Sequence, residues 1–344
     1  MKTALGDIKF ADLQKAFATK YGVTSVAQQF NVAPSIAQEF FEKLQESNGF
    51  LKQINYLPVD DLKGDKVYLA VDDPISSRTN FTDKNNERKP VNPSSLSNKF
   101  YELYEVDADV ELEWAKIDAW SKFKDFFTKF MAQVNKRRAK DKIMCGWHGT
   151  SVADQTDLAA NPLLEDLNIG WLELLRRFDS GSQVITEIVA GSGKVKIGGG
   201  EGADFKNLDE TVADVKQNIP EIYRGDGDLI VILGSNLIDK YELKYWATHG
   251  DLASEKLLVD AKKIMGTFGG LSGMTVPHFP INGILVTSLN NLSIYYQASS
   301  VRRSIKDKVE RKCIQDFMSI NEGYVVENEL KAVYVESDSV ELVD

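Results

Sequence analysis

Apolar residues recur at helical spacing near the start of the chain and at strand spacing after it. Between residues 6 and 21 they lie three or four apart, which predicts an amphipathic helix, and a second such helix is expected after Pro34. From Gly64 to Trp114 the period changes to two, in KVYLAV and again in KFYELYEVDADVELEW, which predicts two strands. The pattern therefore separates a short leading segment from the rest of the chain.

A long polar stretch lies between these two strands. Its sequence, DDPISSRTNFTDKNNERKPVNPSSLSN, contains prolines and many Asn, Ser and Asp residues, so it has too few apolar side chains to pack a core. Loops of this length in a compact domain are usually functional or disordered. We therefore expect an extended hairpin loop here rather than a tight turn.

The longest predicted helix runs from about Ile117 to Met144, with apolar residues three or four apart and no Pro or Gly until Gly146. At about 1.5 Å per residue, its ~26 residues span ~40 Å, which is enough to connect separate regions. The later half alternates helical patterns with short apolar strands such as DLIVILG and GILVTSLNNLSIYYQ, and EGYVVENELKAVYVES predicts a terminal strand or strand pair. This alternation indicates a mixed α/β architecture.

Length and charge narrow the class of protein. With 344 residues the chain exceeds the roughly 250 to 300 residues that one core usually serves, so two lobes sharing a seam are expected. A net charge of -10 argues against gripping nucleic acid as the main task, although a container around nucleic acid remains possible. Asp7, Lys9 and Asp12 interrupt any signal-peptide pattern, and the longest apolar run, 229–233, is far short of a membrane span. We expect a soluble protein without a membrane association.

Candidate chemistry is sparse. VAGSGKVKIGGGEG resembles a phosphate-binding loop around Gly191 and Lys194, but Ile188 and Val195 stand where the full motif needs Gly and Ser or Thr, so a surface loop is the better interpretation. The histidines and cysteines form no complete metal motif, and no nucleophile elbow is present. Two free thiols in a reducing compartment are expected, with one long-range disulfide as the alternative. The residues concerned are Cys145, Cys313, His148, His249 and His278.

Two basic clusters remain, KRRAK at 136–140 and RRSIKDKVERK at 302–312. The first suits the cation preference of a helix end, and the second suits a solvated loop. The alternative for both clusters is a surface that faces a neighbouring subunit or nucleic acid. Neither has the interleaved aromatic residues that are typical of single-strand binding.

The carboxy-terminal stretch LNNLSIYYQASSVRRSIKDKVERKCIQDFMSINEGYVVENEL resembles the signature of one protein family, the major capsid proteins of phage P-two and its relatives, the peduoviruses. There Asn-Leu-Ser-Ile-Tyr-Tyr is followed by an Arg-Arg pair and a Ser-x-Asn-x-x-Tyr-Val-Val-Glu strand. The resemblance continues upstream through NPLLEDLNIGWLELLR, DLIVILGSNLIDKY, VPHFP, SSRT with ERKP, and QESNGFLKQIN, in the same order. Tyr101-Glu102-Leu103, in place of an aromatic-Glu-Cys run, and a looser GLSGMTVPHFP depart from the pattern.

This resemblance implies a Hong Kong 97-type capsid fold, of mixed α/β (α+β) class, in a protein that self-assembles into the icosahedral head shell around double-stranded DNA. The implied partners are other copies of the chain in pentamers and hexamers, a scaffold and maturation protease, and a portal protein. The implied location is the virion, after assembly in the bacterial cytoplasm. The implied divisions are an assembly segment (1–30), an amino-terminal arm (31–63), an extended loop (65–113), a peripheral domain with the spine helix (114–154 and 286–344), and an axial domain (155–285).

The resemblance also implies where the functional residues lie. The leading segment is expected to be cut near Phe30-Asn31, and the arginines of the signature and of the polar stretch are expected to contact neighbouring subunits: Arg302, Arg303, Arg78 and Arg88. No catalytic, cofactor or metal residue is expected. The alternatives are another shell-forming protein of the same fold, such as an encapsulating compartment or a prophage-derived particle, and a soluble nucleotide-binding enzyme that uses Lys194.

Overall fold

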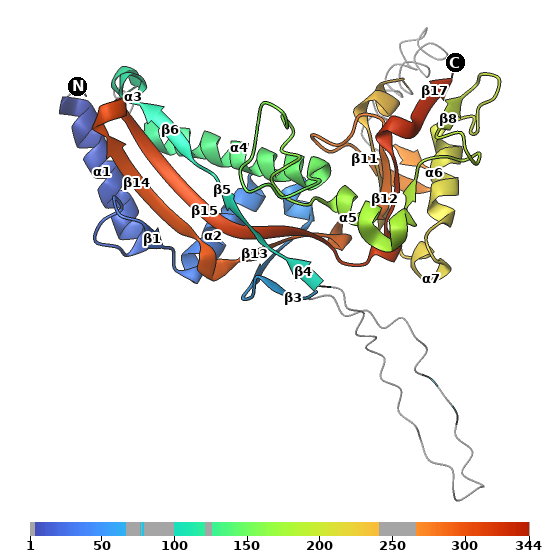
Figure 1. The fold of residues 1–344 in the computed structure, drawn as a ribbon, viewed down its shortest axis with the longest axis horizontal. Helices are drawn as coiled ribbons and strands as arrows, with labels where there is room; N and C mark the ends of the chain where they lie inside the picture. The colour runs from blue at the N-terminus through green and yellow to red at the C-terminus, as the bar shows by residue number, and fades with distance from the viewer. Residues whose placement is uncertain are drawn as a thin grey trace, which may run out of the picture.

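The computed structural model describes residues 4–66, 76, 78, 100–120, 126–240 and 266–343. It is an elongated molecule with one sheet at each end (Figure 1). The first sheet has seven strands in the order β1-β14-β15-β13-β2, with β5 and β6 also pairing with β15. These strands are β1 (Phe30–Asn31), β2 (Asn55–Val59), β5 (Tyr104–Asp107), β6 (Val110–Glu113), β13 (Leu292–Gln297), β14 (Arg302–Lys308) and β15 (Cys313–Val326).

The second sheet has six strands in the order β10-β11-β9-β12-β16-β7. Two strand pairs complete the fold, β3 with β4 and β8 with β17. The strands of the second sheet are β7 (Val184–Ile185), β9 (Leu229–Leu233), β10 (Thr267–Phe268), β11 (Leu271–Met274), β12 (Ile284–Ser288) and β16 (Val333–Val335). The paired strands are β3 (Lys63–Asp65), β4 (Phe100–Glu102), β8 (Val195–Gly198) and β17 (Val340–Val343).

Helices accompany both sheets. Helix α1 runs beside β14 at one end of the molecule, α4 lies along the seven-stranded sheet, and α6 lies beside the six-stranded sheet (Figure 1). Pro34 starts α2, where a proline costs no backbone hydrogen bond, and the Asn207 side chain caps the first turn of α6. The helices are α1 (Ala4–Tyr21), α2 (Pro34–Glu46), α3 (Trp114–Trp120), α4 (Phe126–His148), α5 (Trp171–Arg177), α6 (Leu208–Gln217) and α7 (Glu221–Arg224).

Trp171 lies in the core that joins the two sheets. It is fully buried, its ring centroid lies 4.8 Å from that of Trp147 and 5.1 Å from that of Tyr324, and its indole nitrogen donates to the Ser293 carbonyl at 3.0 Å. The same apolar cluster contains residues of both sheets, such as Ile294 of β13 together with Ile232, Leu285 and Tyr334 of the second sheet. The predicted seam between two lobes is therefore a shared core.

A glycine inside α4 makes this packing possible. A Cβ atom built on Gly146 would lie 2.3 Å from the nearest ring carbon of Trp171, closer than non-bonded atoms can approach. The helical pattern continues through Gly146 to His148, so the glycine does not end the helix as its low helix propensity suggests. Tertiary packing accounts for the glycine at this position.

Most predicted elements of the first sheet are present. The strand LSIYY is β13, which pairs with β15 on one side and β2 on the other, so it completes a sheet as predicted. The polar stretch is flanked by the antiparallel pair β3 and β4, although most of KVYLAV lies outside the described residues. The helix predicted over 117–144 corresponds to α3 and α4, with 121–125 between them also outside the described part of the chain.

The end of the chain contributes to both sheets. Within the predicted peripheral range 286–344, β13, β14 and β15 belong to the first sheet, whereas β16 pairs with β12 and β7, and β17 pairs with β8, beside the second sheet. All three residues of β16 are buried, which explains why VYV joins a second core rather than extending β15. The strand pair predicted at the terminus is therefore two strands in different parts of the molecule.

Candidate assembly site

Strand β14 brings the two sites predicted from the sequence together. In the antiparallel pairing of β1 with β14, Phe30 lies opposite Arg303 and Asn31 lies opposite Arg302. The predicted cleavage position and the arginine pair are about 270 residues apart in sequence, and a two-residue strand gives too short a pattern to predict their pairing. The two predicted sites therefore lie side by side at the edge of the seven-stranded sheet.

The two arginines have opposite environments, because successive residues of a strand point to opposite faces of the sheet. Arg302 is exposed and lies 3.6 Å from the Glu105 carboxylate, while Arg303 is only 4% exposed. The Arg303 guanidinium donates to both carboxylate oxygens of Asp316, at 2.9 and 2.8 Å, which is the bidentate geometry that binds most strongly. The Arg303 charge is thus paired within the chain, and contact of the two arginines with a neighbouring subunit stays a prediction, which the exposed Arg302 fits better.

The leading helix supplies the remaining contacts of Arg303. The guanidinium donates to the Tyr21 hydroxyl at 2.6 Å, and its central carbon lies 4.7 Å from the ring centroid of Phe17 and 5.7 Å from that of Tyr21. A cation above aromatic faces is attracted by the ring quadrupole. Arg303 therefore connects α1 to the sheet.

A second buried arginine shares the same carboxylate. Arg138 of α4 is 6% exposed, lies 3.6 Å from Asp316 and donates to the Ala108 carbonyl at 2.6 Å. Its Nε and Nη1 atoms are buried without a hydrogen-bond partner, and burial lowers the pKa of the Arg138 guanidinium. Two buried cations thus depend on one carboxylate, so the charge of Asp316 is essential to this cluster.

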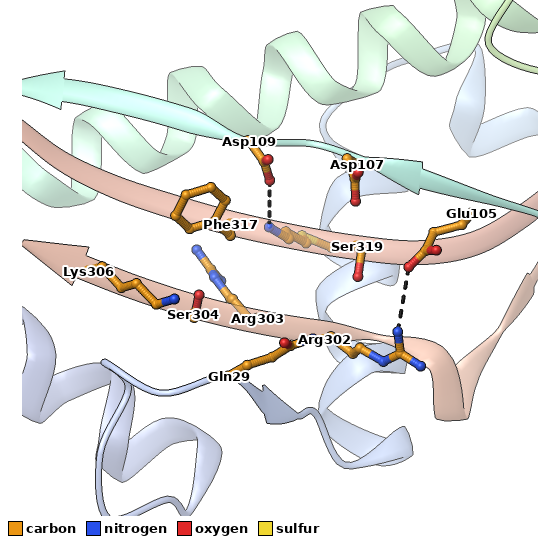
Figure 2. A pocket seen from close by; sticks show the side chains of 11 residues that line it. Gln29, Glu105, Asp107, Asp109, Arg302, Arg303, Ser304, Lys306, Phe317 and Ser319 are labelled. Atoms are coloured by element: carbon orange, nitrogen blue, oxygen red, sulfur yellow. Dashed lines mark hydrogen bonds and ion pairs between the residues drawn. The ribbon is translucent and has the colours of Figure 1, made fainter. Parts of the chain in front are cut away.

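A groove with both signs of charge lies on the Arg302 side of the strand. Figure 2 shows Glu105, Asp107 and Asp109 from β5 and the turn after it facing Arg302 and Lys306 from β14. Burial raises the pKa of Asp107, and the neighbouring Asp109 and Glu105 carboxylates add to this effect. Asp109 accepts a hydrogen bond from the Met318 backbone nitrogen at 3.1 Å. The groove is open, polar and suited to contacts with another charged surface.

The other predicted arginines are less informative. Arg78 is exposed, and Arg88 lies outside the described residues. In the basic cluster of α4, Arg137 forms a 2.7 Å ion pair with Asp141, while Arg138 is the buried residue described above. Sequence reasoning missed Asp316 and Tyr21 as members of this site. The signal for Asp316 was a single acid in the mostly apolar first half of β15, CIQDFM.

The glycine-rich loop does not present free amide groups to a phosphate. The Glu187 carboxylate accepts from the Gly191 nitrogen at 3.0 Å and from the Gly193 nitrogen at 2.8 Å, and this contact lowers the pKa of Glu187. The Lys194 ammonium donates to the Asp338 carbonyl at 3.0 Å. The anion position of this loop is therefore filled by a side chain of the same chain.

The remaining chemical candidates are the cysteines and histidines. Cys145 and Cys313 are both free and buried, and burial raises the pKa of the Cys145 thiol to about 12. His148 contacts the His278 carbonyl at 2.7 Å through Nε2, and His249 lies outside the described ranges. Within the described parts of the chain, no cluster of three or more His, Cys, Asp or Glu side chains could hold a metal ion. No helix of those parts is long and apolar enough to cross a bilayer.

Two sheets at the ends of an elongated subunit, a long helix along one of them and a hairpin base from which a long polar stretch departs are the architecture of a phage capsid subunit of the Hong Kong 97-like fold. The family model described as "Phage major capsid protein, P2 family" matches residues 9–337. The chain belongs to this family. It is a major capsid protein that forms the shell of a phage head, as the resemblance predicted.

Individual relatives agree. The chain is 33% identical over 92% of its length to the protein described as "Capsid proteins" of Escherichia phage P2, covering 88% of that protein. It is 29% identical to the "Major capsid protein" of Serratia phage KSP20, covering 92% of this chain and 90% of the relative. A solved structure, the procapsid of satellite phage P4 with its size determination protein, contains a chain with a TM-score of 0.81 and 30% identity over 98% of both chains.

Proposed function

We propose that this chain builds a closed icosahedral head from pentamers and hexamers around double-stranded DNA, assembled in the bacterial cytoplasm with a scaffold, a maturation protease and a portal protein. The observation that carries the proposal is the match to a procapsid chain along 98% of both chains. Shell subunits of this kind spread their contact energy over many patches rather than over one apolar face. Its role is structural rather than catalytic.

The peripheral and axial divisions of the subunit follow the two sheets. In this proposal the seven-stranded sheet with α4 forms the peripheral part, the six-stranded sheet with β8 and β17 forms the axial part, and residues 31–63 form the arm. The exposed Arg302 beside Glu105, together with Arg78 and Arg88, contacts neighbouring subunits. Electron microscopy of the purified protein tests the proposal: closed shells support it, and only soluble monomers in the presence of scaffold would refute it.

We further propose that the leading segment is removed at or near Phe30-Asn31 during maturation. The position is exposed at Asn31 and lies where α1 and its connection end, so a cut there separates a complete helix from the sheet. Intact-mass measurement of protein from mature particles is decisive. A chain that starts within two or three residues of Asn31 supports the cut, and a chain that starts at Met1 or Lys2 contradicts it.

A further inference from the structure

The bond between Phe30 and Asn31 is held on both sides by β14. Upstream, the Ile305 nitrogen donates to the Val26 carbonyl at 2.7 Å; downstream, the Val32 nitrogen donates to the Val301 carbonyl at 2.9 Å. Val26 and Val32 are buried, at 2% and 4% exposure, although residues 27–29 between the anchors are exposed. A protease that binds its substrate as an added strand needs several residues free on each side of the bond. In this conformation Val26, Phe30, Asn31 and Val32 are already paired with β14 or the residue before it, so the segment is tied down on both sides of the bond.

The Phe30 side chain is engaged as well. Its ring centroid lies 5.3 Å from that of Tyr21, the last residue of α1, and Tyr21 in turn is 5.8 Å from Phe17 in a stacked arrangement. The Tyr21 hydroxyl accepts from Arg303, which is fixed by Asp316. A protease can therefore bind the Phe30 side chain in its specificity pocket only after this ring leaves Tyr21.

Helix α1 is docked firmly enough to make this opening costly. Phe10 and Tyr21 are 6% and 8% exposed, and Phe10 packs in an apolar cluster with Leu112, Ile305 and Ile314 of the sheet. The short amphipathic helix is thus stabilised by tertiary contacts rather than by its own propensity. The sheet supplies both an apolar surface and a buried cation for it.

We propose that α1, held by Arg303 through Tyr21 and Phe17, is a latch that keeps the Phe30–Asn31 bond closed to proteolysis until α1 leaves the sheet. This inference rests on the proposed cleavage and adds its regulation: release of α1 precedes the cut. Proteolysis of a transiently opened segment follows the population of the open form when closing is fast. Weakening the latch therefore accelerates cleavage at this bond.

Chymotrypsin, which cuts after aromatic residues, is a suitable probe on unassembled full-length subunits. Tyr21→Phe keeps the stacked ring and removes only the hydroxyl that accepts from a charged group, so cleavage after Phe30 is expected to rise about tenfold or more. Phe17→Ala removes the ring below the guanidinium and is expected to give a similar or larger rise. Intact-mass analysis counts the fragment that begins at Asn31.

Two controls distinguish opening of the latch from global unfolding of the subunit. Arg302 lies opposite Asn31 itself and forms its ion pair with Glu105 of β5, so the cleavage rate of Arg302→Gln is expected to stay within about twofold of wild type. Cleavage after Phe205, buried at 8% beside the second sheet, reports global opening in the same digest and is expected to stay unchanged. Equal rates at Phe30 in wild type, Tyr21→Phe and Phe17→Ala overturn the latch, as does an equal acceleration at Phe205. A virion chain that starts at Met1 overturns the cleavage but leaves this digest result intact.

Discussion

Single replacements of Arg302 and Arg303 measure how much each arginine contributes to the free energy of unfolding of the free subunit. In Arg303→Met the carboxylate of Asp316, whose side chain is 11% exposed, keeps only the more distant Arg138 at 3.6 Å as a cation. Breaking a buried ion pair by removing one partner costs ~3–5 kcal/mol. Because Arg138 compensates in part and methionine retains apolar contact with Phe17, we expect the lower end, ~3 kcal/mol. With a urea slope of ~3 kcal/mol per molar or more, the midpoint falls by up to ~1 M.

Arg302→Met is the matched control on the adjacent residue. The side chains of Arg302 and Glu105 are 50% and 58% exposed, so their ion pair is screened by solvent and is worth at most ~1 kcal/mol. Asp316→Asn is the opposite extreme, because it leaves two buried guanidinium groups without a carboxylate. We therefore expect the urea midpoint to fall in the order Arg302→Met, Arg303→Met, Asp316→Asn, with the first close to wild type.

The assay is urea unfolding of unassembled subunits, followed by far-ultraviolet circular dichroism at one fixed protein concentration, since assembly stabilises the folded state by mass action. Equal midpoints for Arg303→Met and Arg302→Met refute the reasoning, because they mean that Arg303 is not committed within the chain. Shell assembly is measured separately on the same variants. If Arg302→Met assembles poorly although its urea midpoint is close to wild type, the result supports an intersubunit role for Arg302 alone.

Other parts of the molecule give three further predictions. Gly146→Ala forces a Cβ into Trp171 and is expected to cost ~1–3 kcal/mol or more in urea unfolding, whereas Gly225→Ala, with no atom within 4 Å of the added Cβ, stays within ~0.5 kcal/mol; equal costs refute the packing argument. Because burial raises the pKa of Cys145 to about 12, its thiol stays protonated at pH 8, and mass-detected alkylation by iodoacetamide is expected only upon unfolding; rapid labelling of the native chain contradicts this. Replacing residues 76–95 by a short Gly-Ser turn is expected to leave a folded subunit, because the β3–β4 pairing lies outside the replaced residues, but to abolish normal shells in electron micrographs; normal particles contradict a role of this stretch in assembly.

The sequence predicted elements best where one pattern persisted over many residues. The helices at 6–21 and after Pro34 have a period that burial on one face imposes, and the strand LSIYY is a short apolar run that is buried on both faces, so the local pattern was sufficient to predict all three. The burial of Arg303 depends on a partner 13 residues away in another strand and on a helix at the start of the chain. Two adjacent arginines read as a surface cluster, yet in a strand they must face opposite sides. The alternation of side chains along a strand was therefore the sequence signal that could have predicted one exposed and one buried arginine.

Strand β14 holds both α1 and the Phe30–Asn31 bond, which gives a reason for a fixed order of assembly and the proposed cleavage. Helix α1 and the residues after it cover Leu112, Ile305 and Ile314, and they provide the hydroxyl and aromatic faces around Arg303. A subunit that loses this cover before it meets its neighbours exposes an apolar surface together with a buried cation, and exposed surfaces of that kind favour aggregation. A closed latch delays the cut until other contacts can replace the lost ones. In this proposal, the same arginine that stabilises the free subunit also protects the bond that is proposed to be cut.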